Sequence, residues 1–423
     1  MTPIAQLLVY GLPLAVLACQ AIAVIDHWPV RPLSLLSPLY NSPIVSISAL
    51  LIALLALRRG EIVPLLKVGL FFEAVRLSYL LVWRQVPFAE TLSAVGLSFW
   101  FASLFISGWK FLTGCGPERR RALDDGATKF ALLGLFVLGH SLVAWTARYL
   151  PWTFDNYFYA FDGLLPFPIA QTIEKTVSSR RWAWSILEVV YYSLFVVAFA
   201  FIRMQYQNGT SSGHLLSRWL LVGLLGFGLY FIVPGVGPKV AFYLKANASL
   251  PVPANVPLAL MHHGGSEPRN AMPSLHTAWA FLLVIVALRM SMAALIGAGV
   301  FAFATLLATL GLGEHYFVDL VVALPFVVAV HALVSLFDGH AGKRRSATVA
   351  LAAGLLFTAW LPTIELGTGY LREIPWVASS FVLGTIIVSV WLVALMEHGP
   401  RLQTQAPVAG STPLSPREAE PLR

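Results

Sequence analysis

The chain has 423 residues, of which 58% are hydrophobic and only 11% are charged. This composition excludes an ordinary soluble protein, because apolar runs of about 18 or more residues recur along the whole length and predict membrane-spanning helices. The formal net charge is +8. The basic residues lie in short segments between the apolar runs, which indicates contact with lipid headgroups and argues against a nucleic-acid partner.

Taken in chain order, the apolar runs predict an all-α, polytopic transmembrane helical bundle with about 12 spans. The predicted spans are residues 3–25, 43–57, 62–83, 92–113, 128–149, 183–203, 215–235, 273–290, 292–312, 316–337, 347–363 and 376–396. The first run has no basic segment in front of it and is long enough to cross, so we expect a retained helix and not a cleaved signal.

Two segments differ from the rest. The stretch "PWTFDNYFYAFDGLLPFP" (residues 151–168) is rich in aromatic residues, and we expect it to lie on the membrane surface. Its Asp155 and Asp162 are expected to cap interfacial helices, with contact to a lipid headgroup as the alternative. Residues 397–423 have little to bury and are predicted to form a disordered tail.

The basic clusters predict the orientation. If the spans alternate, one side receives Arg58-Arg59, Arg119-Arg120-Arg121, Arg203 with Arg218, and Lys343-Arg344-Arg345. The positive-inside tendency makes that side cytoplasmic, so the loops at 234–272 and 311–315 face outward. Lys175, Arg180 and Arg181 oppose this assignment, since they fall outside.

The other residues that could suggest metal or disulfide chemistry are few. Cys19 and Cys115 are too scattered for a disulfide framework and predict apolar packing. His262 and His263 have neither a cysteine nor a carboxylate at ligand spacing beside them, so we expect no metal there.

Two histidines are spaced so that they can meet. His276, in "MPSLHTAW", opens one apolar run, and His315, in "GLGEHYFVDL", closes the next. The 39 residue steps from one to the other correspond to roughly 58 Å of helix, close to two crossings of a hydrocarbon core of about 30 Å. Both histidines can therefore return to one membrane face. Asp319 follows His315 by one helical turn, and an ionised carboxylate there needs a partner, for which His315 is the nearest candidate.

This set of residues suits phosphoryl transfer. A neutral histidine can attack phosphorus, a carboxylate can orient it, and a second histidine can deliver a proton to the leaving group. Lys239 and Arg269 are candidate phosphate ligands, and Ser274 is either a ligand or a helix cap. The backbone amides of Ser274, Leu275 and His276 could also point at an anion. Glu314 precedes His315, but we expect its side chain to point elsewhere.

The two motifs resemble the second and third signature motifs of the type 2 phosphatidic acid phosphatase superfamily. "PSLH" and "GEHYFVDL" are most similar to the branch of inositol phosphorylceramide synthases, which has Leu where the common phosphatases have Gly. The resemblance implies a six-helix catalytic core over residues 151–337, with His315 as nucleophile, His276 as general acid and Asp319 as orienting carboxylate. It implies no metal or other cofactor. Residues 1–150 and the two C-terminal spans within 338–396 lie outside it.

Two features depart from the family pattern. Ala308 and Thr309 stand where the third motif carries Ser-Arg, and Lys239 is not followed by the Arg-Pro of the first motif. The catalytic residues are therefore better supported than the phosphate ligands.

The sequence as a whole predicts an integral membrane phosphotransferase or phosphatase of a lipid phosphate or phosphodiester. The branch slightly favours transferase. A transporter or lipid flippase remains the alternative, although its site would be expected at the midplane. A non-catalytic lipid-binding relative is a third possibility. The expected partners are a membrane lipid and the bilayer, and no protein partner is predicted. The expected location is a bacterial inner membrane, with the site on the periplasmic or extracellular side.

Overall fold

The computed structural model describes residues 62–83, 95–124, 149–207, 213–243, 253–264, 267–338 and 342–397, together with residues 53, 126, 130, 143, 146 and 147. The α-helices are α4 (Ile62–Trp83), α6 (Val95–Thr113), α8 (Asp155–Asp162), α9 (Ile169–Ser178), α10 (Arg181–Gln207), α11 (Gly213–Leu229), α12 (Leu275–Ala287), α13 (Met292–Gly311), α14 (Phe317–Asp338), α15 (Lys343–Pro362), α16 (Thr368–Leu371) and α17 (Pro375–Glu397). The predicted spans at 3–25, almost all of 43–57 and most of 128–149 lie outside the described residues.

The described fold is all-α apart from one very short ladder. Strand β1 (Trp152–Thr153) pairs antiparallel with β2 (Met261–His262), and Trp152 lies opposite His262. Short turns of other helix types occur as well: η3 (Lys239–Tyr243) and η5 (Thr363–Gly367) are π-helical, and η4 (Pro253–Asn255) is a 3₁₀ turn. The ladder joins the segment before α8 to the loop that leads to α12.

Five described helices are long and apolar enough to cross a membrane, which indicates an integral membrane protein. They are Arg181–Gln205, Met292–Gly311, Phe317–Phe337, Lys343–Leu371 and Pro375–Glu397. Leu215–Leu229 and Leu275–Ala287 are shorter apolar helices. Each of these seven overlaps a predicted span, while the total of about 12 spans remains a prediction.

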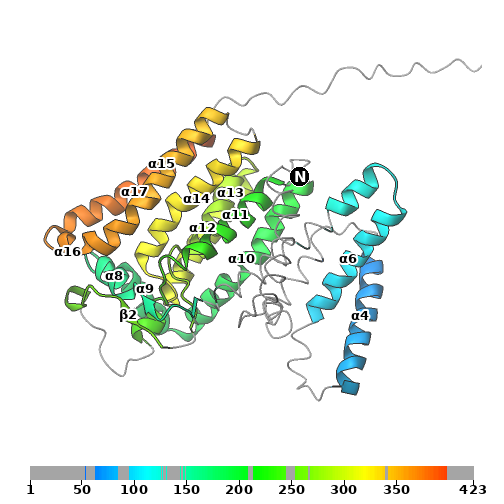
Figure 1. Cartoon of the computed structure of the whole chain (residues 1–423), viewed down its shortest axis with the longest axis horizontal. Helices are drawn as coiled ribbons and strands as arrows, with labels where there is room; N and C mark the ends of the chain where they lie inside the picture. Colours follow the sequence, from blue (N-terminus) through cyan, green and yellow to red (C-terminus); the bar gives the residue numbers. More distant parts are fainter. Residues whose placement is uncertain are drawn as a thin grey trace, which may run out of the picture.

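Helix α14 is the centre of the described bundle. In the most apolar 18-residue stretch of α14, 72% of the residues are buried, against 22–39% in the corresponding stretches of the other four long helices. It packs against α12 and α11 and also against α15 and α17. Figure 1 shows α15 and α17 beyond α14, with α10 towards the other side and the α4–α6 pair farthest along. Since α14 begins two residues after His315, the most enclosed helix carries the candidate site at its first turn.

Aromatic residues fill the core between α10, α11 and α12. The rings of Trp219 and Trp279 are stacked with centroids 5.0 Å apart, and the Trp279 indole donates to the Trp219 carbonyl at 3.1 Å. Trp100 of α6 belongs to the same buried cluster. Burial of rings of this size stabilises the packing and holds the first half of α12 against α11.

The middle of the segment expected on the membrane surface, α8, is instead enclosed by protein, whereas Trp152 and Phe167 near its two ends are exposed. In α8 every residue but Tyr157 is buried, and Phe158 and Phe161 have no exposed surface. The Phe161 ring contacts Trp360 of α15, while Phe158 contacts Tyr316. The expectation of a surface-lying segment is therefore wrong for α8, because its aromatic residues cover the end of α14 and find their apolar partners there.

Arg218, expected on the cytoplasmic side near the start of the predicted span 215–235, is enclosed by protein. It lies inside α11 with 1% of its surface exposed. Its guanidinium donates to His331 Nδ1 and to Ser335 Oγ of α14, each at 2.9 Å. His331 Nε2 in turn lies 3.1 Å from Glu397 of α17, which also pairs with Arg289. A buried polar network thus joins α11, α14 and α17 at the ends opposite the candidate site.

Candidate active site

The loop between α13 and α14 holds His315 in a fixed position. Thr309 O accepts the backbone N–H groups of Glu314 and His315 at 3.1 and 3.3 Å, and Gly313 turns the chain with φ of 69°. The His315 side chain is 3% exposed. Its Nδ1 lies 2.8 Å from the Ala271 carbonyl, which accepts a hydrogen bond from it. This bond places the proton on Nδ1 and leaves the lone pair of Nε2 available.

Asp319 lies beside His315, as expected, but its hydrogen bond is made to the backbone. Its Oδ2 accepts the Tyr316 N–H at 2.9 Å and lies 3.5 Å from His315 Nδ1, too far for a hydrogen bond. Its Oδ1 is buried without a hydrogen-bond partner. The Ala271 carbonyl therefore fixes the His315 tautomer, while Asp319 holds the first turn of α14 through the Tyr316 N–H.

His276 is brought to His315 as the spacing predicted. It is the second residue of α12, and the centroids of the two imidazole rings are 6.4 Å apart. The other face of the arrangement comes from α10, where the Tyr191 ring stacks on His276 with centroids 3.7 Å apart. Sequence reasoning missed Tyr191, since nothing in its own helix distinguishes it from neighbouring aromatic residues.

Ser274 caps α12. Its hydroxyl accepts the Thr277 N–H at 3.4 Å and the Thr277 hydroxyl at 3.1 Å. Two of the three amides expected to face an anion are already bonded, since Ser274 N donates to Asp319 O at 3.3 Å and the Leu275 amide interacts with the Tyr230 phenol. A phosphate-binding role for Ser274 stays a prediction, and its hydroxyl in this structure stabilises the helix start.

Lys239 reaches the loop of the nucleophile. Its backbone N–H donates to Gly313 O at 2.8 Å, and its Nζ lies 3.1 Å from Glu314 Oε1 and 5.3 Å from the centre of the Trp184 ring. About a third of each side chain in the Lys239–Glu314 pair is exposed. The Glu314 side chain was expected to point away from the site. It is instead the counter-ion of Lys239, a predicted phosphate ligand.

Arg269 is buried at the same end of the bundle, but its guanidinium is turned to the backbone. It donates to Leu150 O at 3.2 Å, to His263 O at 2.8 Å and to Glu267 O. Burial lowers its pKa, and the charges of Glu267 and Asp155 oppose that shift. These bonds tie the loop before α12 to the end of the segment at Leu150, so the structure assigns Arg269 a scaffolding position. Its role as a phosphate ligand remains a prediction.

Two buried carboxylates hold the loops around the histidines. Asp155 accepts the backbone N–H groups of Val236 and Gly237 at 3.1 and 3.0 Å and the Tyr316 hydroxyl at 2.7 Å. Burial raises its pKa, and these hydrogen bonds oppose the rise. Asp155 therefore fixes the loop that carries Lys239 relative to the residue after His315, a function that a lipid-headgroup contact would not require.

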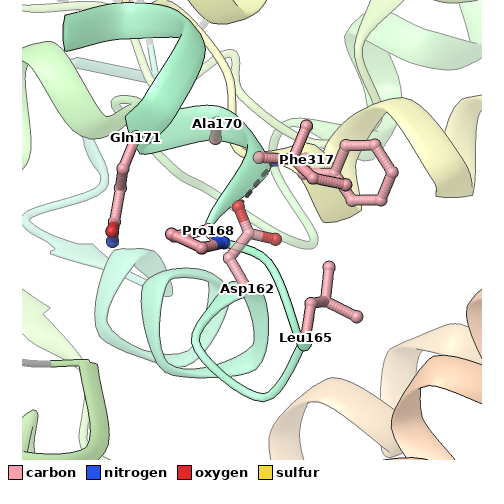
Figure 2. A pocket seen from close by; sticks show the side chains of 7 residues that line it. Asp162, Leu165, Pro168, Ala170, Gln171 and Phe317 are labelled. Atoms are coloured by element: carbon pink, nitrogen blue, oxygen red, sulfur yellow. Dashed lines mark hydrogen bonds between the residues drawn. The ribbon is translucent and has the colours of Figure 1, made fainter.

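Asp162 caps the helix that follows the nucleophile. Its two carboxylate oxygens accept the N–H groups of Phe317 and Val318 at 2.7 and 2.9 Å, and Figure 2 shows the first of these bonds. Burial raises the pKa of Asp162 to about 8. The sequence predicted a cap but on an interfacial helix, whereas the capped helix is α14. A small pocket beside it is lined by Asp162, Leu165, Pro168, Ile169, Ala170, Gln171 and Phe317.

The adjacent residues His262 and His263, in the loop before α12, have different partners. The His262 ring contacts Trp152 with centroids 4.9 Å apart, and His263 pairs with Glu267 at 3.1 Å. Within the part of the chain that the structure describes, no group of three or more His, Cys, Asp or Glu residues could hold a metal ion.

The comparison with known families agrees with this site. A family model described as the PAP2 superfamily, the type 2 phosphatidic acid phosphatases, matches residues 156–333, from the second residue of α8 to the last third of α14. The matched region contains His276, His315 and Asp319. Searches among curated proteins and among solved structures found no match. Residues 156–333 of this membrane protein therefore form a PAP2 superfamily domain.

Proposed function

We propose that this protein is a membrane enzyme that transfers the phosphoryl group of a lipid phosphate or phosphodiester through a phosphohistidine on His315. One observation carries the proposal: His315 Nδ1 donates to the Ala271 carbonyl, which leaves the Nε2 lone pair free, and the His276 ring lies 6.4 Å away. Burial lowers the pKa of His315 to about 4, so the ring is neutral at neutral pH, as a nucleophile must be.

The first half of the reaction forms the intermediate. His315 Nε2 attacks phosphorus, the N–P bond forms and the P–O bond to the leaving group breaks with its electron pair on oxygen. His276 gives a proton to that oxygen, and it must acquire this proton when the anionic donor binds, because burial lowers its pKa. The separation of 6.4 Å between the rings is compatible with one phosphorus centre lying between them. The Lys239 ammonium is the proposed ligand of the phosphoryl oxygens.

The second half regenerates the enzyme. An acceptor oxygen attacks phosphorus, the N–P electron pair returns to His315, and His276 takes the acceptor proton. Water as acceptor makes the enzyme a phosphatase, and a lipid or polyol hydroxyl makes it a phosphotransferase. The Leu275 of "PSLH" supports the transferase, in line with the resemblance to inositol phosphorylceramide synthases.

The proposal also covers which side of the membrane the site faces and how the rest of the chain is organised around it. The basic residues Lys343, Arg344 and Arg345 begin α15, the helix that runs back from the far end of α14. The positive-inside tendency puts that end in the cytoplasm, so the histidines face the periplasm or the cell exterior of a bacterial inner membrane. Lipid substrate then enters from the outer leaflet. Residues 151–337 are the proposed six-helix catalytic core, with helical extensions on both sides.

The test is an assay of the purified full chain without divalent metal. Phosphatidic acid, phosphatidylinositol and undecaprenyl pyrophosphate are supplied in turn, and free phosphate and lipid products are measured. We expect turnover that His315→Ala abolishes and that His262→Ala, a matched change in an exposed histidine at the same end, leaves intact. Turnover that survives His315→Ala would refute the mechanism. Absence of turnover with every donor would favour the transporter or flippase. Headgroup transfer without phosphate release identifies a transferase.

A further inference from the structure

The cation that the structure places beside the nucleophile loop is already paired. Lys239 Nζ lies 3.1 Å from Glu314 Oε1, and both side chains are about one third exposed, so the pair lies at an accessible edge of an otherwise buried site. A phosphoryl group that binds Lys239 must therefore share this ammonium with a carboxylate that immediately precedes the nucleophile.

The backbone keeps Glu314 in this place. Lys239 N donates to Gly313 O at 2.8 Å, so the two loops are joined directly in front of Glu314. Gly237 has φ of 81°, and a Cβ there would collide with the Glu314 carbonyl. Asp155 accepts the N–H groups of Val236 and Gly237 and fixes the opposite side of the same loop. The two charges are therefore held near each other by their backbones.

The Glu314 carboxylate also acts on the residues around the histidines. It interacts electrostatically with His315 and with the phenols of Tyr191 and Tyr192. Tyr191 stacks on His276. Glu314 is thus close enough to His315, and to the tyrosine that stacks on His276, for its charge to be felt by a group bound at the nucleophile.

We infer that Glu314 makes the site selective for the charge of the phosphoryl donor, favouring monoanionic phosphodiesters over dianionic phosphate monoesters. The inference rests on the proposed function. A phosphodiester carries one negative charge, whereas a monoester carries between one and a half and two near pH 7, as a protein-bound phosphate does at about −1.5 to −2. Glu314 repels the additional negative charge of a monoester. Lys239 offsets this repulsion only in part, because its own charge is already neutralised by Glu314.

The experiment compares two lipid donors in the full-length protein. Phosphatidylinositol serves as the diester and phosphatidic acid as the monoester, in mixed micelles of identical composition, and kcat/KM is measured for each with wild type, Glu314→Gln and Glu267→Gln. Glu267 is a matched control because its carboxylate is also partly exposed and paired, with His263 at 3.1 Å. Each variant removes one negative charge from the same end of the protein.

We expect Glu314→Gln to raise the kcat/KM ratio of monoester to diester by about tenfold, a value reduced from the full Coulomb term because the pair is partly exposed. Glu267→Gln should leave the ratio within about twofold, as screened charges farther away do. An unchanged ratio in Glu314→Gln, or an equal shift in Glu267→Gln, overturns the inference.

One further variant covers the case in which Glu314→Gln does not fold, and one further measurement tests the charge selectivity without a mutation. If Glu314→Gln does not elute as a folded protein, Glu314→Asp is used, and its shorter side chain should shift the ratio in the same direction. Inhibition of wild type by inorganic phosphate should weaken as pH rises and the phosphate becomes a dianion, and strengthening would contradict the inference. Failure of the proposed function is distinguished by turnover that does not depend on His315 with either donor.

Discussion

The ring of Tyr191 stacks on the ring of His276, with centroids 3.7 Å apart and an angle of 19° between the planes. Tyr191 comes from α10 and His276 from the first turn of α12, so the contact joins two helices at the candidate site. Stacking restricts rotation of the imidazole, and a general acid must be held in line with the leaving oxygen.

Removal of this contact should reduce the chemical step. We expect Tyr191→Ala to lower kcat about tenfold with little change in KM, because the variant loosens His276 without touching a lipid ligand. Tyr191→Phe retains the ring and should retain most of kcat. Steady-state kinetics of the two variants check this. If Tyr191→Phe loses as much kcat as Tyr191→Ala, the Tyr191 hydroxyl and not the stacking contact supports the chemical step.

Asp319 should contribute less than His315. The His315 proton is held by the Ala271 carbonyl, and Asp319 Oδ2 is 3.5 Å from the ring while it accepts the Tyr316 N–H. We therefore expect Asp319→Asn, whose amide oxygen can still accept the Tyr316 N–H, to keep the fold and to lower kcat by about a hundredfold at most, whereas His315→Ala leaves no turnover. Single-turnover rates compare the two. An Asp319→Asn variant as inactive as His315→Ala would show that the carboxylate is the orienting group.

Asp162 should make stability depend on pH. Its folded pKa of about 8 is above the ordinary value of 3.8, so its contribution is full below pH 4 and is lost as the pH rises through 8. His315, whose pKa is lowered to about 4, has the opposite effect, but only between about pH 4 and 6.5. The interval from pH 6.5 to 8 therefore isolates the carboxyl groups.

In that interval the melting temperature of wild type should fall with rising pH. Asp162→Asn, which cannot ionise, should show a fall smaller by a few °C, a size typical of about 1 kcal/mol in a domain of this length. Thermal unfolding in detergent at pH 6.5, 7.2 and 8 measures it, with the exposed Glu118→Gln as control. Parallel curves for wild type and Asp162→Asn would rule out Asp162 as the source.

The network at the far end should affect stability and not chemistry. Glu397 accepts from His331 and pairs with Arg289, while Arg218 donates to the other nitrogen of His331. Glu397→Ala leaves buried positive charge without its counter-ion, which costs about 3–5 kcal/mol when a buried pair is broken. We expect a lower melting temperature with kcat per folded molecule unchanged. The exposed Glu373→Gln is the control, and a loss of kcat without loss of stability would contradict this reading.

Some of the architecture follows from apolar run length alone. Residues 292–312, 316–337 and 376–396 were predicted as spans, and α13, α14 and α17 agree to within one residue at each end. The spacing of His276 and His315 predicted their approach for the same reason, since two helices of fixed rise must return to one face. These features depend on local hydropathy and helix geometry, which each segment carries by itself.

Two other features could not be predicted from the sequence of any single segment. Arg218 was expected near the cytoplasmic start of a span and is enclosed by protein, and α8 was expected on the membrane surface and is also enclosed. Hydropathy does not separate a helix that faces lipid from one that faces protein, because both surroundings are apolar. It therefore gave no indication that α14 is the most buried of the long helices while α15 is the least.

The sequence by itself determined that this is a helical membrane protein with two histidines brought to one end and a carboxylate one turn beyond. The tertiary structure decided what surrounds them: the Ala271 carbonyl on His315, Tyr191 on His276, Glu314 on Lys239 and Asp162 on the start of α14. Each of these partners comes from a different element of the chain, and Glu314 meets Lys239 because two distant loops are hydrogen bonded to each other. Hydrogen bonds and ion pairs act over about 3 Å, so they are set by how the loops meet and not by the order of residues within one segment.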